Sequence, residues 1–257
     1  MRSMQTNNLW FPFVSPNPAA QVRLFCFHYA GGRAGIFRQW LSMAPRWLQV
    51  VTVELPGRGA RLREELFCNL DALVDALRDM IGHYLNMPFA FFGHSMGGII
   101  CFELARALRR AGQKRPIHLF LSAHRAPHLP NPRGTTYDLP HDAFIEKIAA
   151  MNGTPAIVLK NPELLELIVP ILRADFEICD TYSYVEEPPL KCPFTVFGGK
   201  DDRVVPPEML PSWVRHTTSE FQIHTFCGDH FFFHEVEKQV LQIVSEQLAQ
   251  TLKLQDG

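Results

Sequence analysis

Six short apolar stretches recur along the chain and alternate with longer amphipathic ones. The short stretches are nearly continuously apolar and rich in β-branched and aromatic residues, which is typical of parallel strands buried on both faces. They are VRLFCF (22–27), VVTVEL (50–55), FAFF (89–92), IHLFLS (117–122), FTVF (194–197) and FQIHTF (221–226). Apolar residues recur at helical spacing in 70–85, 99–112 and 235–252. This alternation predicts an α/β protein with a mostly parallel central sheet flanked by helices.

The interval between Ser122 and Phe194 breaks the alternation. Its patterns are helical, over 139–151 and over 161–182, where we expect an interruption at Pro170. We therefore predict one domain over residues 1–257 with a helical subdomain, residues 126–190, inserted in it. Because long insertions rich in Leu and Ile often gate sites, we expect a mobile lid over a pocket. A rigid cap that completes the core is the alternative.

Composition and charge narrow the class of protein. The 257 residues are 47% hydrophobic and 20% charged, with a formal net charge of −1 and no long basic run, so nucleic-acid binding is not expected. MRSMQTNNLW lacks the apolar core of a signal peptide, and no apolar run is long enough to span a membrane. We expect a soluble cytoplasmic protein. The cysteines are scattered without metal-binding spacing and are expected to be reduced; they are Cys26, Cys68, Cys101, Cys179, Cys192 and Cys227.

The sequence GHSMGG (93–98) places Ser95 between two glycines, each two residues away. This G-x-S-x-G pattern is typical of a nucleophile elbow, where a strained serine lies at a sharp turn from a strand into a helix. Glycines are needed there because strand and helix approach closely. A strand pattern precedes Ser95 and a helical pattern follows it, as the motif requires. A serine that only caps a helix would not explain both glycines, so we expect Ser95 to be a nucleophile.

A serine nucleophile needs a base and a carboxylate that orients the base. In α/β-hydrolases the acid and then the histidine follow the serine along the chain. FGGKDDRVVP (197–206) offers Asp201 at a predicted strand end and Asp202 one residue further on. We expect Asp201 to orient the base and Asp202 to cap a turn or face solvent. In CGDHFFFHE (227–235), His230 follows the last predicted strand and is the expected base.

Other titratable side chains near these motifs receive structural roles. His224 lies within a strand pattern and His234 opens the last helix, so both are expected to be core or surface residues. Asp229 is expected to be a loop residue. His94 adjoins the nucleophile and must point elsewhere, and His28 is expected to hold its loop by hydrogen bonding. None of them is assigned to the chemistry.

Two backbone N–H groups are needed to bind the oxyanion of the tetrahedral intermediate. One belongs to the residue after the nucleophile, which is Met96. The other is expected in the loop after the first strong strand, FHYAGG (27–32), where Ala30 is the best candidate. A plain glycine turn is the alternative reading of this loop. The expected chemistry requires no metal and no cofactor.

Taken together, these residues resemble the type II thioesterases of polyketide and nonribosomal-peptide assembly lines, which belong to the α/β-hydrolase superfamily. The resemblance covers about Val22 to Leu248 and leaves the first 20 residues without a counterpart. Its motifs, in order, are HYAGG, LPGRGARLRE, GHSMGG, NGTP, NPEL, PILRADF, DTYSY and GDHFF. His28 stands where many members have proline. Carried over by position, the catalytic triad is Ser95, Asp201 and His230, the oxyanion donors are Ala30 and Met96, and the helical interval is the lid.

The resemblance implies hydrolysis of acyl thioesters on the phosphopantetheine arm of an acyl- or peptidyl-carrier protein, in editing or release. A mammalian relative releases medium-chain fatty acids, so the family alone does not fix the acyl group. A carboxylesterase or a chain-releasing cyclase on the same scaffold is one alternative. A non-catalytic binding protein is another, but it predicts a broken triad. We expect a monomer that binds neither nucleic acid nor membranes.

Three arginines in GRGARLR (57–63) lie just beyond a predicted strand end, at the edge of the sheet where active sites open. By family resemblance, carrier proteins are acidic around the phosphopantetheine. Arg58, Arg61 and Arg63 are therefore a candidate steering surface for the carrier. Local pairing with Glu64 and Glu65 is the alternative.

Overall fold

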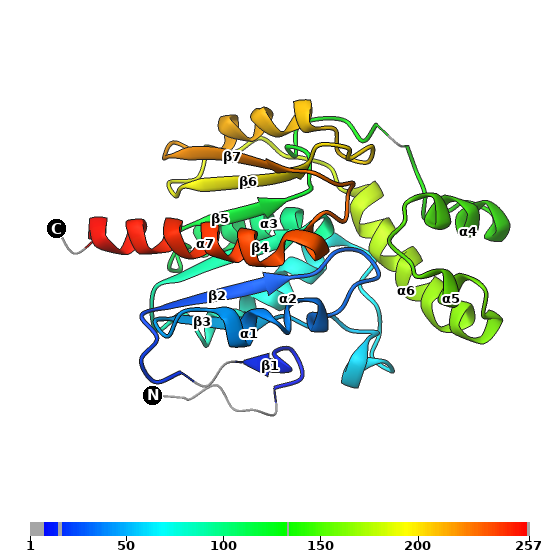
Figure 1. The fold of residues 1–257 in the computed structure, drawn as a ribbon, viewed down its shortest axis with the longest axis horizontal. Coiled ribbons are helices and arrows are strands. Elements are labelled where there is room, and N and C mark those ends of the chain that lie inside the picture. Colours follow the sequence, from blue (N-terminus) through cyan, green and yellow to red (C-terminus); the bar gives the residue numbers. More distant parts are fainter. Residues whose placement is uncertain (1–7, 15–16, 133, 256–257) are drawn as a thin grey trace.

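A seven-stranded sheet runs through the computed structural model, which describes residues 8–14, 17–132 and 134–255 (Figure 1). The strands are β1 (Phe13–Val14), β2 (Val22–Phe27), β3 (Leu48–Thr52), β4 (Phe89–His94), β5 (Leu119–Ser122), β6 (Phe194–Gly199) and β7 (Phe221–Phe226). The α-helices are α1 (Trp40–Met43), α2 (Leu70–Gly82), α3 (Met96–Arg110), α4 (His141–Ala150), α5 (Ala156–Leu159), α6 (Pro162–Thr181) and α7 (Phe233–Gln255). Three 3₁₀ helices are η1 (Ala34–Phe37), η2 (Gly59–Arg61) and η3 (Pro207–His216).

The strand order is β1-β3-β2-β4-β5-β6-β7, and only β1 pairs antiparallel. The six expected strands are all present, and the predicted α/β architecture with a mostly parallel central sheet flanked by helices is confirmed. β1 was not predicted, because two residues at a sheet edge show no periodicity.

Helices cover both faces of the sheet, and successive strand residues point to opposite faces. On one face, Phe25 and Phe27 of β2 pack in the apolar cluster that contains α2 and α3. On the other face, Leu24 and Cys26 pack in the cluster that contains α1 and α7. Strands buried on both sides explain the continuous apolar runs in the sequence.

Helices α4, α5 and α6 lie between β5 and β6 in the sequence and beyond the carboxyl edge of the strands in space (Figure 1). They have a small apolar cluster of their own, formed by Phe144, Ile148, Val169, Leu172 and Phe176. We refer to residues 126–190 as the helical insertion.

The expected interruption of the second lid helix at Pro170 is wrong, because α6 continues through it. A proline removes one backbone donor and leaves a carbonyl one turn earlier without its partner. Pro170 and Glu166 are both exposed, so this turn of the helix lies open to solvent.

No helix in the described part of the chain is long and apolar enough to cross a membrane. The first seven residues, which include most of the stretch tested for a signal peptide, lie outside the described residues.

Candidate active site

Ser95 lies at the turn between β4 and α3 and has a φ of 54°, which residues other than glycine rarely adopt. The predicted strain at the elbow is thus present. A Cβ atom on Gly93 would lie 2.0 Å from the carbonyl oxygen of Gly97, and one on Gly97 would lie 2.2 Å from that of Phe27. Both glycines are therefore required by backbone contacts. The turn is fixed by Ser95 N–H, which donates to Ser122 O at 2.7 Å.

Ser95, His230 and Asp202 form a continuous hydrogen-bonded chain. His230 Nε2 lies 2.9 Å from Ser95 Oγ, and His230 Nδ1 lies 2.8 Å from Asp202 Oδ2. His230 is 6% exposed and Asp202 is 3% exposed, so both are shielded from water. The three come from the carboxyl-terminal ends of β4, β6 and β7, which meet at one edge of the parallel sheet.

The expectation that Asp201 orients the histidine is wrong, and Asp202 takes its place. Asp201 is exposed, and its N–H donates to Gly228 O. Asp202 does cap a turn, as expected, because its Oδ1 accepts from the N–H groups of Val204 and Val205 at 2.7 and 2.9 Å. The same carboxylate points inward, however, and presents its other oxygen to His230. Asp202 thus caps the turn with Oδ1 and contacts the base with Oδ2.

His94 is a fully buried support for the base. Its Nε2 lies 3.0 Å from the carbonyl oxygen of His230, which can only accept, so Nε2 carries the proton. Ser122 Oγ then donates to Nδ1 at 2.8 Å. Burial, together with the neighbouring His230, lowers the pKa of His94 well below its ordinary value, so the ring stays neutral. The side chain points away from Ser95, as the sequence analysis expected.

His28 holds the loop that follows β2. Its Nδ1 donates to Tyr29 O at 2.9 Å, and burial lowers its pKa to about 3. The same loop is anchored from α7, where His234 Nε2 lies 3.0 Å from the Tyr29 hydroxyl. His224 is half-buried and stacks on Phe197. The structural roles expected for these three histidines agree with the structure.

The amides of the β2–η1 loop differ in their partners. Gly31 N–H donates to Asp175 Oδ2 at 2.7 Å, and Gly32 N–H donates to Tyr29 O at 2.9 Å. Within the described residues, Ala30 N–H has no protein acceptor. Met96 is the first residue of α3, and its N–H therefore has no acceptor within the helix.

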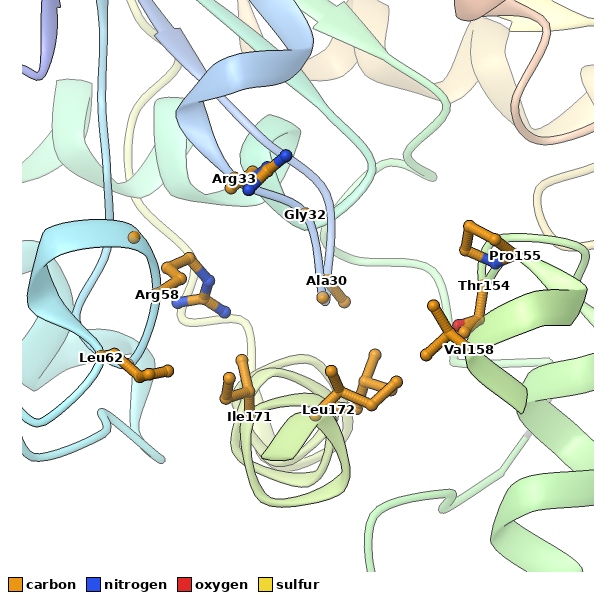
Figure 2. A pocket seen from close by; sticks show the side chains of 15 residues that line it. Ala30, Gly32, Arg33, Arg58, Leu62, Thr154, Pro155, Val158, Ile171 and Leu172 are labelled. Carbon is orange, nitrogen blue, oxygen red and sulfur yellow. The ribbon is translucent and has the colours of Figure 1, made fainter. Parts of the chain in front are cut away.

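A cavity of about 410 Å³ begins at this loop (Figure 2). Figure 2 shows Ala30 facing it, with Arg58 and Leu62 on one side and Val158 of α5 on the other. Residues of the helical insertion complete its wall, including Thr154, Pro155, Ile168, Ile171 and Leu172. The wall is therefore shared between the sheet edge and the insertion.

The hypothesis that Arg58, Arg61 and Arg63 form one exposed steering surface is wrong. Arg58 is 6% exposed and forms an ion pair with Asp175. Arg61 is 4% exposed, pairs with Glu64 at 2.6 Å and lies 3.7 Å from the ring centre of Trp10. Only Arg63 is exposed. Arg58 and Arg61 are thus paired within the molecule and are not available to a carrier protein. The pairing of Arg61 with Glu64 is the alternative that the sequence analysis gave.

Asp229 is an exposed loop residue, and its Oδ1 accepts from Phe231 N–H at 2.8 Å. Among the residues that the structure describes, no group of three or more His, Cys, Asp or Glu side chains is placed to hold a metal ion.

The sheet order, the elbow and the Ser95–His230–Asp202 chain are together those of an α/β-hydrolase with a serine nucleophile. The thioesterase domain model matches residues 22–250, and the chain belongs to the thioesterase family.

The chain is similar to proteins of peptide and polyketide biosynthesis. Gramicidin S biosynthesis protein GrsT of Aneurinibacillus migulanus is 41% identical over 241 residues, which cover 94% of each chain. Linear gramicidin dehydrogenase LgrE of Brevibacillus parabrevis is 43% identical, covering 93% of this chain and 92% of its own. The type II thioesterase BorB from the borrelidin cluster is 32% identical, has a TM-score of 0.82 and covers 90% of this chain and 94% of its own.

The name of LgrE describes a redox reaction, whereas the site of this chain has the geometry of acyl transfer. Family and structural neighbours agree with that geometry, and the protein is a thioester hydrolase.

Proposed function

We propose that this protein hydrolyses acyl groups from the phosphopantetheine arm of a carrier protein, with Ser95 as nucleophile, His230 as base and Asp202 as the orienting carboxylate. The observation that carries the proposal is the chain from Ser95 Oγ through His230 to Asp202, with contacts of 2.9 and 2.8 Å. GrsT belongs to gramicidin S biosynthesis and BorB to the borrelidin cluster, and both relationships support a carrier-bound substrate.

The reaction proceeds in two halves. Ser95 Oγ attacks the thioester carbonyl while His230 Nε2 takes its proton, and Asp202 stabilises the imidazolium. The oxyanion accepts hydrogen bonds from the N–H groups of Ala30 and Met96. The C–S bond then breaks, and His230 returns the proton to the pantetheine sulfur. Water, deprotonated by His230, attacks the acyl-enzyme and releases the carboxylic acid and the free serine.

The cavity beside Ala30 is a suitable site for the acyl group. A carbonyl oxygen bound at Ala30 N–H lies at the edge of this cavity, and the insertion supplies apolar side chains such as Ile171 and Leu172. We propose that the helical insertion is a mobile lid and that the acyl group lies between it and the sheet edge. The volume of about 410 Å³ is in the range of small-molecule sites.

Hydrolysis of a panel of acylated carrier proteins, followed by intact mass, tests the proposal. We expect loss of the acyl mass from the carrier and no loss with Ser95→Ala. A small thioester and its oxygen-ester twin, assayed in parallel, separate a thioesterase from a carboxylesterase. A cyclised product in place of the free acid would indicate a cyclase. Turnover of free thioesters with every acyl-carrier left intact would contradict the carrier as substrate.

A further inference from the structure

Asp175 is a buried carboxylate on α6 that lies outside the Ser95–His230–Asp202 chain. It is 2% exposed. Its Oδ2 accepts from Gly31 N–H at 2.7 Å and also pairs with the Arg58 guanidinium. Asp175 Oδ2 on α6 thus contacts both the loop that carries Ala30 and Arg58 in the segment that follows β3. A buried charge requires such partners, because leaving it unpaired is strongly destabilising.

Arg58 is fixed from the side of the sheet. Its Nη1 donates to the carbonyl oxygen of Pro56 at 2.8 Å, and the residue is 6% exposed. In Figure 2, Arg58 lies beside Ala30 at the wall of the cavity. The guanidinium therefore holds Asp175 in place while being held itself by the sheet edge.

Gly31 makes this anchor necessary. It has a φ of 73° and is followed by a second glycine, so the loop has much conformational freedom in itself. A Cβ atom on Gly31 would lie 2.4 Å from Leu172 Cδ2, which shows how closely α6 packs on this residue. Because Gly31 N–H belongs to the peptide unit that begins at Ala30, its bond to Asp175 fixes the rotation of the chain directly beside the Ala30 N–H group.

We propose that Asp175, held by Arg58, is a positioning residue that orients the Ala30 N–H group for the oxyanion, so that this donor is set only when α6 is docked. This inference rests on the proposed role of Ala30 and deepens it. Docking of the insertion would then complete the oxyanion site as well as cover the cavity.

The test compares Asp175→Ala with Asp175→Asn on a small acyl thioester. Removing one oxyanion donor lowers kcat by about 10²- to 10³-fold. A donor that is present but misoriented should lower kcat by the same factor or less. We expect kcat to fall about 10- to 100-fold in Asp175→Ala with little change in KM. Asp175→Asn keeps an acceptor for Gly31 and should recover part of the rate. An alkyl trifluoromethyl ketone, which forms an oxyanion on Ser95, should lose affinity in parallel with kcat/KM.

A double variant separates positioning from stability. Arg58→Met with Asp175→Leu leaves no unpaired buried charge, and apolar replacements of buried pairs often retain stability. We expect it to be more stable than Asp175→Ala while its kcat stays low, since Gly31 still lacks its anchor. Recovery of kcat together with stability would overturn the inference.

The matched control is the buried ion pair of Glu103 and Arg106, at 2.6 Å, on α3. Among the described residues, its other hydrogen bonds and ion pairs reach Tyr182, Val185 and Glu187, which lie outside the β2–η1 loop. Glu103→Gln should lower stability but leave kcat per folded molecule and the affinity for the ketone unchanged. If Asp175→Ala behaves like Glu103→Gln while Ser95→Ala is inactive, the positioning role fails and the proposed function stands. If Ser95→Ala retains activity, the proposed function itself fails.

Discussion

The strands around Ser95 and the helices that face them bury their apolar side chains to different extents. Every residue of β4 and β5 is buried. By contrast, α5 has no buried residue, and its Ile157 is 76% exposed; Leu167 on α6 is 54% exposed. In α6 the buried residues begin only at Val169. The sheet is therefore held by a core of its own, whereas the helices of the insertion bury only two side chains of α4 and the second half of α6.

This difference separates two tasks. Ser95, Asp202 and His230 follow the ends of strands that are packed in the core. We therefore expect the distances between them not to depend on the insertion. The wall of the cavity and the anchor of Gly31 depend on α6, which has fewer buried contacts. Segments with few buried apolar contacts open locally at low free energy. We therefore expect a rigid reaction centre beside a cavity wall that opens, as proposed above for the helical insertion.

The largest expected effect lies at the sheet edge. Ser95→Ala should lower kcat by about 10⁴-fold or more, because the triad acts as a unit around its nucleophile. Burst and steady-state assays on an acyl thioester measure the loss, and circular dichroism checks the fold. A variant that keeps more than about a hundredth of the activity would show that Ser95 does not carry the reaction.

The two neighbouring aspartates give the next largest contrast. Asp202→Asn should lower kcat by about 10³- to 10⁴-fold, because the amide can donate to His230 Nδ1 and so favour the wrong tautomer. Asp201→Asn is the matched control: the side chain is exposed, and we expect activity within about threefold of wild type, as for surface changes away from the site. Steady-state kinetics decide between them. Greater damage from Asp201→Asn would restore the assignment made from the sequence.

Hydrogen exchange tests the mechanical side of the comparison. Amides of α5 and of residues 162–168 should exchange about 100-fold faster or more than those of β4 and β5, because they open locally rather than by global unfolding. Residues 169–178, which include Asp175, should be intermediate. Protection of α5 and residues 162–168 equal to that of the central strands would show a rigid cap and contradict the mobile lid.

The smallest expected effect is the fall in the free energy of unfolding at acidic pH. Burial lowers the pKa of His118 from 6.5 to about 3, where the ring packs on Phe120 and lies 2.8 Å from Thr195 Oγ1. The unfolded chain binds the proton first, so the stability contribution is complete above pH 6.5 and is lost as pH falls from 6.5 toward 3. Between pH 7.5 and 5, this histidine alone should lower the free energy of unfolding by about 2 kcal/mol.

Urea unfolding of His118→Gln at pH 7.5 and pH 5 measures this contribution. The variant should lose about 2 kcal/mol less than wild type over that interval. His83→Gln, an exposed histidine, is the control and should keep the wild-type difference. An unchanged pH difference in His118→Gln would contradict the buried neutral state.

The sequence predicted those features whose cause is local. The strand over 22–27 and the elbow at Ser95 follow from a repeated pattern and from two glycines that no other residue can replace. The orienting carboxylate was assigned to Asp201 instead of Asp202 because β6 runs to Gly199, two residues beyond the expected end at Phe197. The turn after it closes through Asp202 N–H to Gly199 O, and this determines which aspartate points inward.

The signal for Asp202 was present in the sequence. An aspartate two and three residues before the valines it caps is a common turn arrangement, and it fixes the direction of the side chain. The pairing of Asp175 with Arg58 and Gly31 had no such signal. These residues are far apart in the sequence, and only the docking of α6 brings them together.

The contact between His94 and the carbonyl oxygen of His230 has a consequence for redesign. Adjacent residues of β4 and the elbow, His94 and Ser95, touch two different atoms of His230, its backbone oxygen and its ring nitrogen. A replacement for the loop of residues 227–232 must therefore reproduce both atoms at once. An imidazole grafted from a neighbouring position meets only half of this requirement. Libraries that vary this loop should keep residue 230 fixed and select on the backbone that carries it.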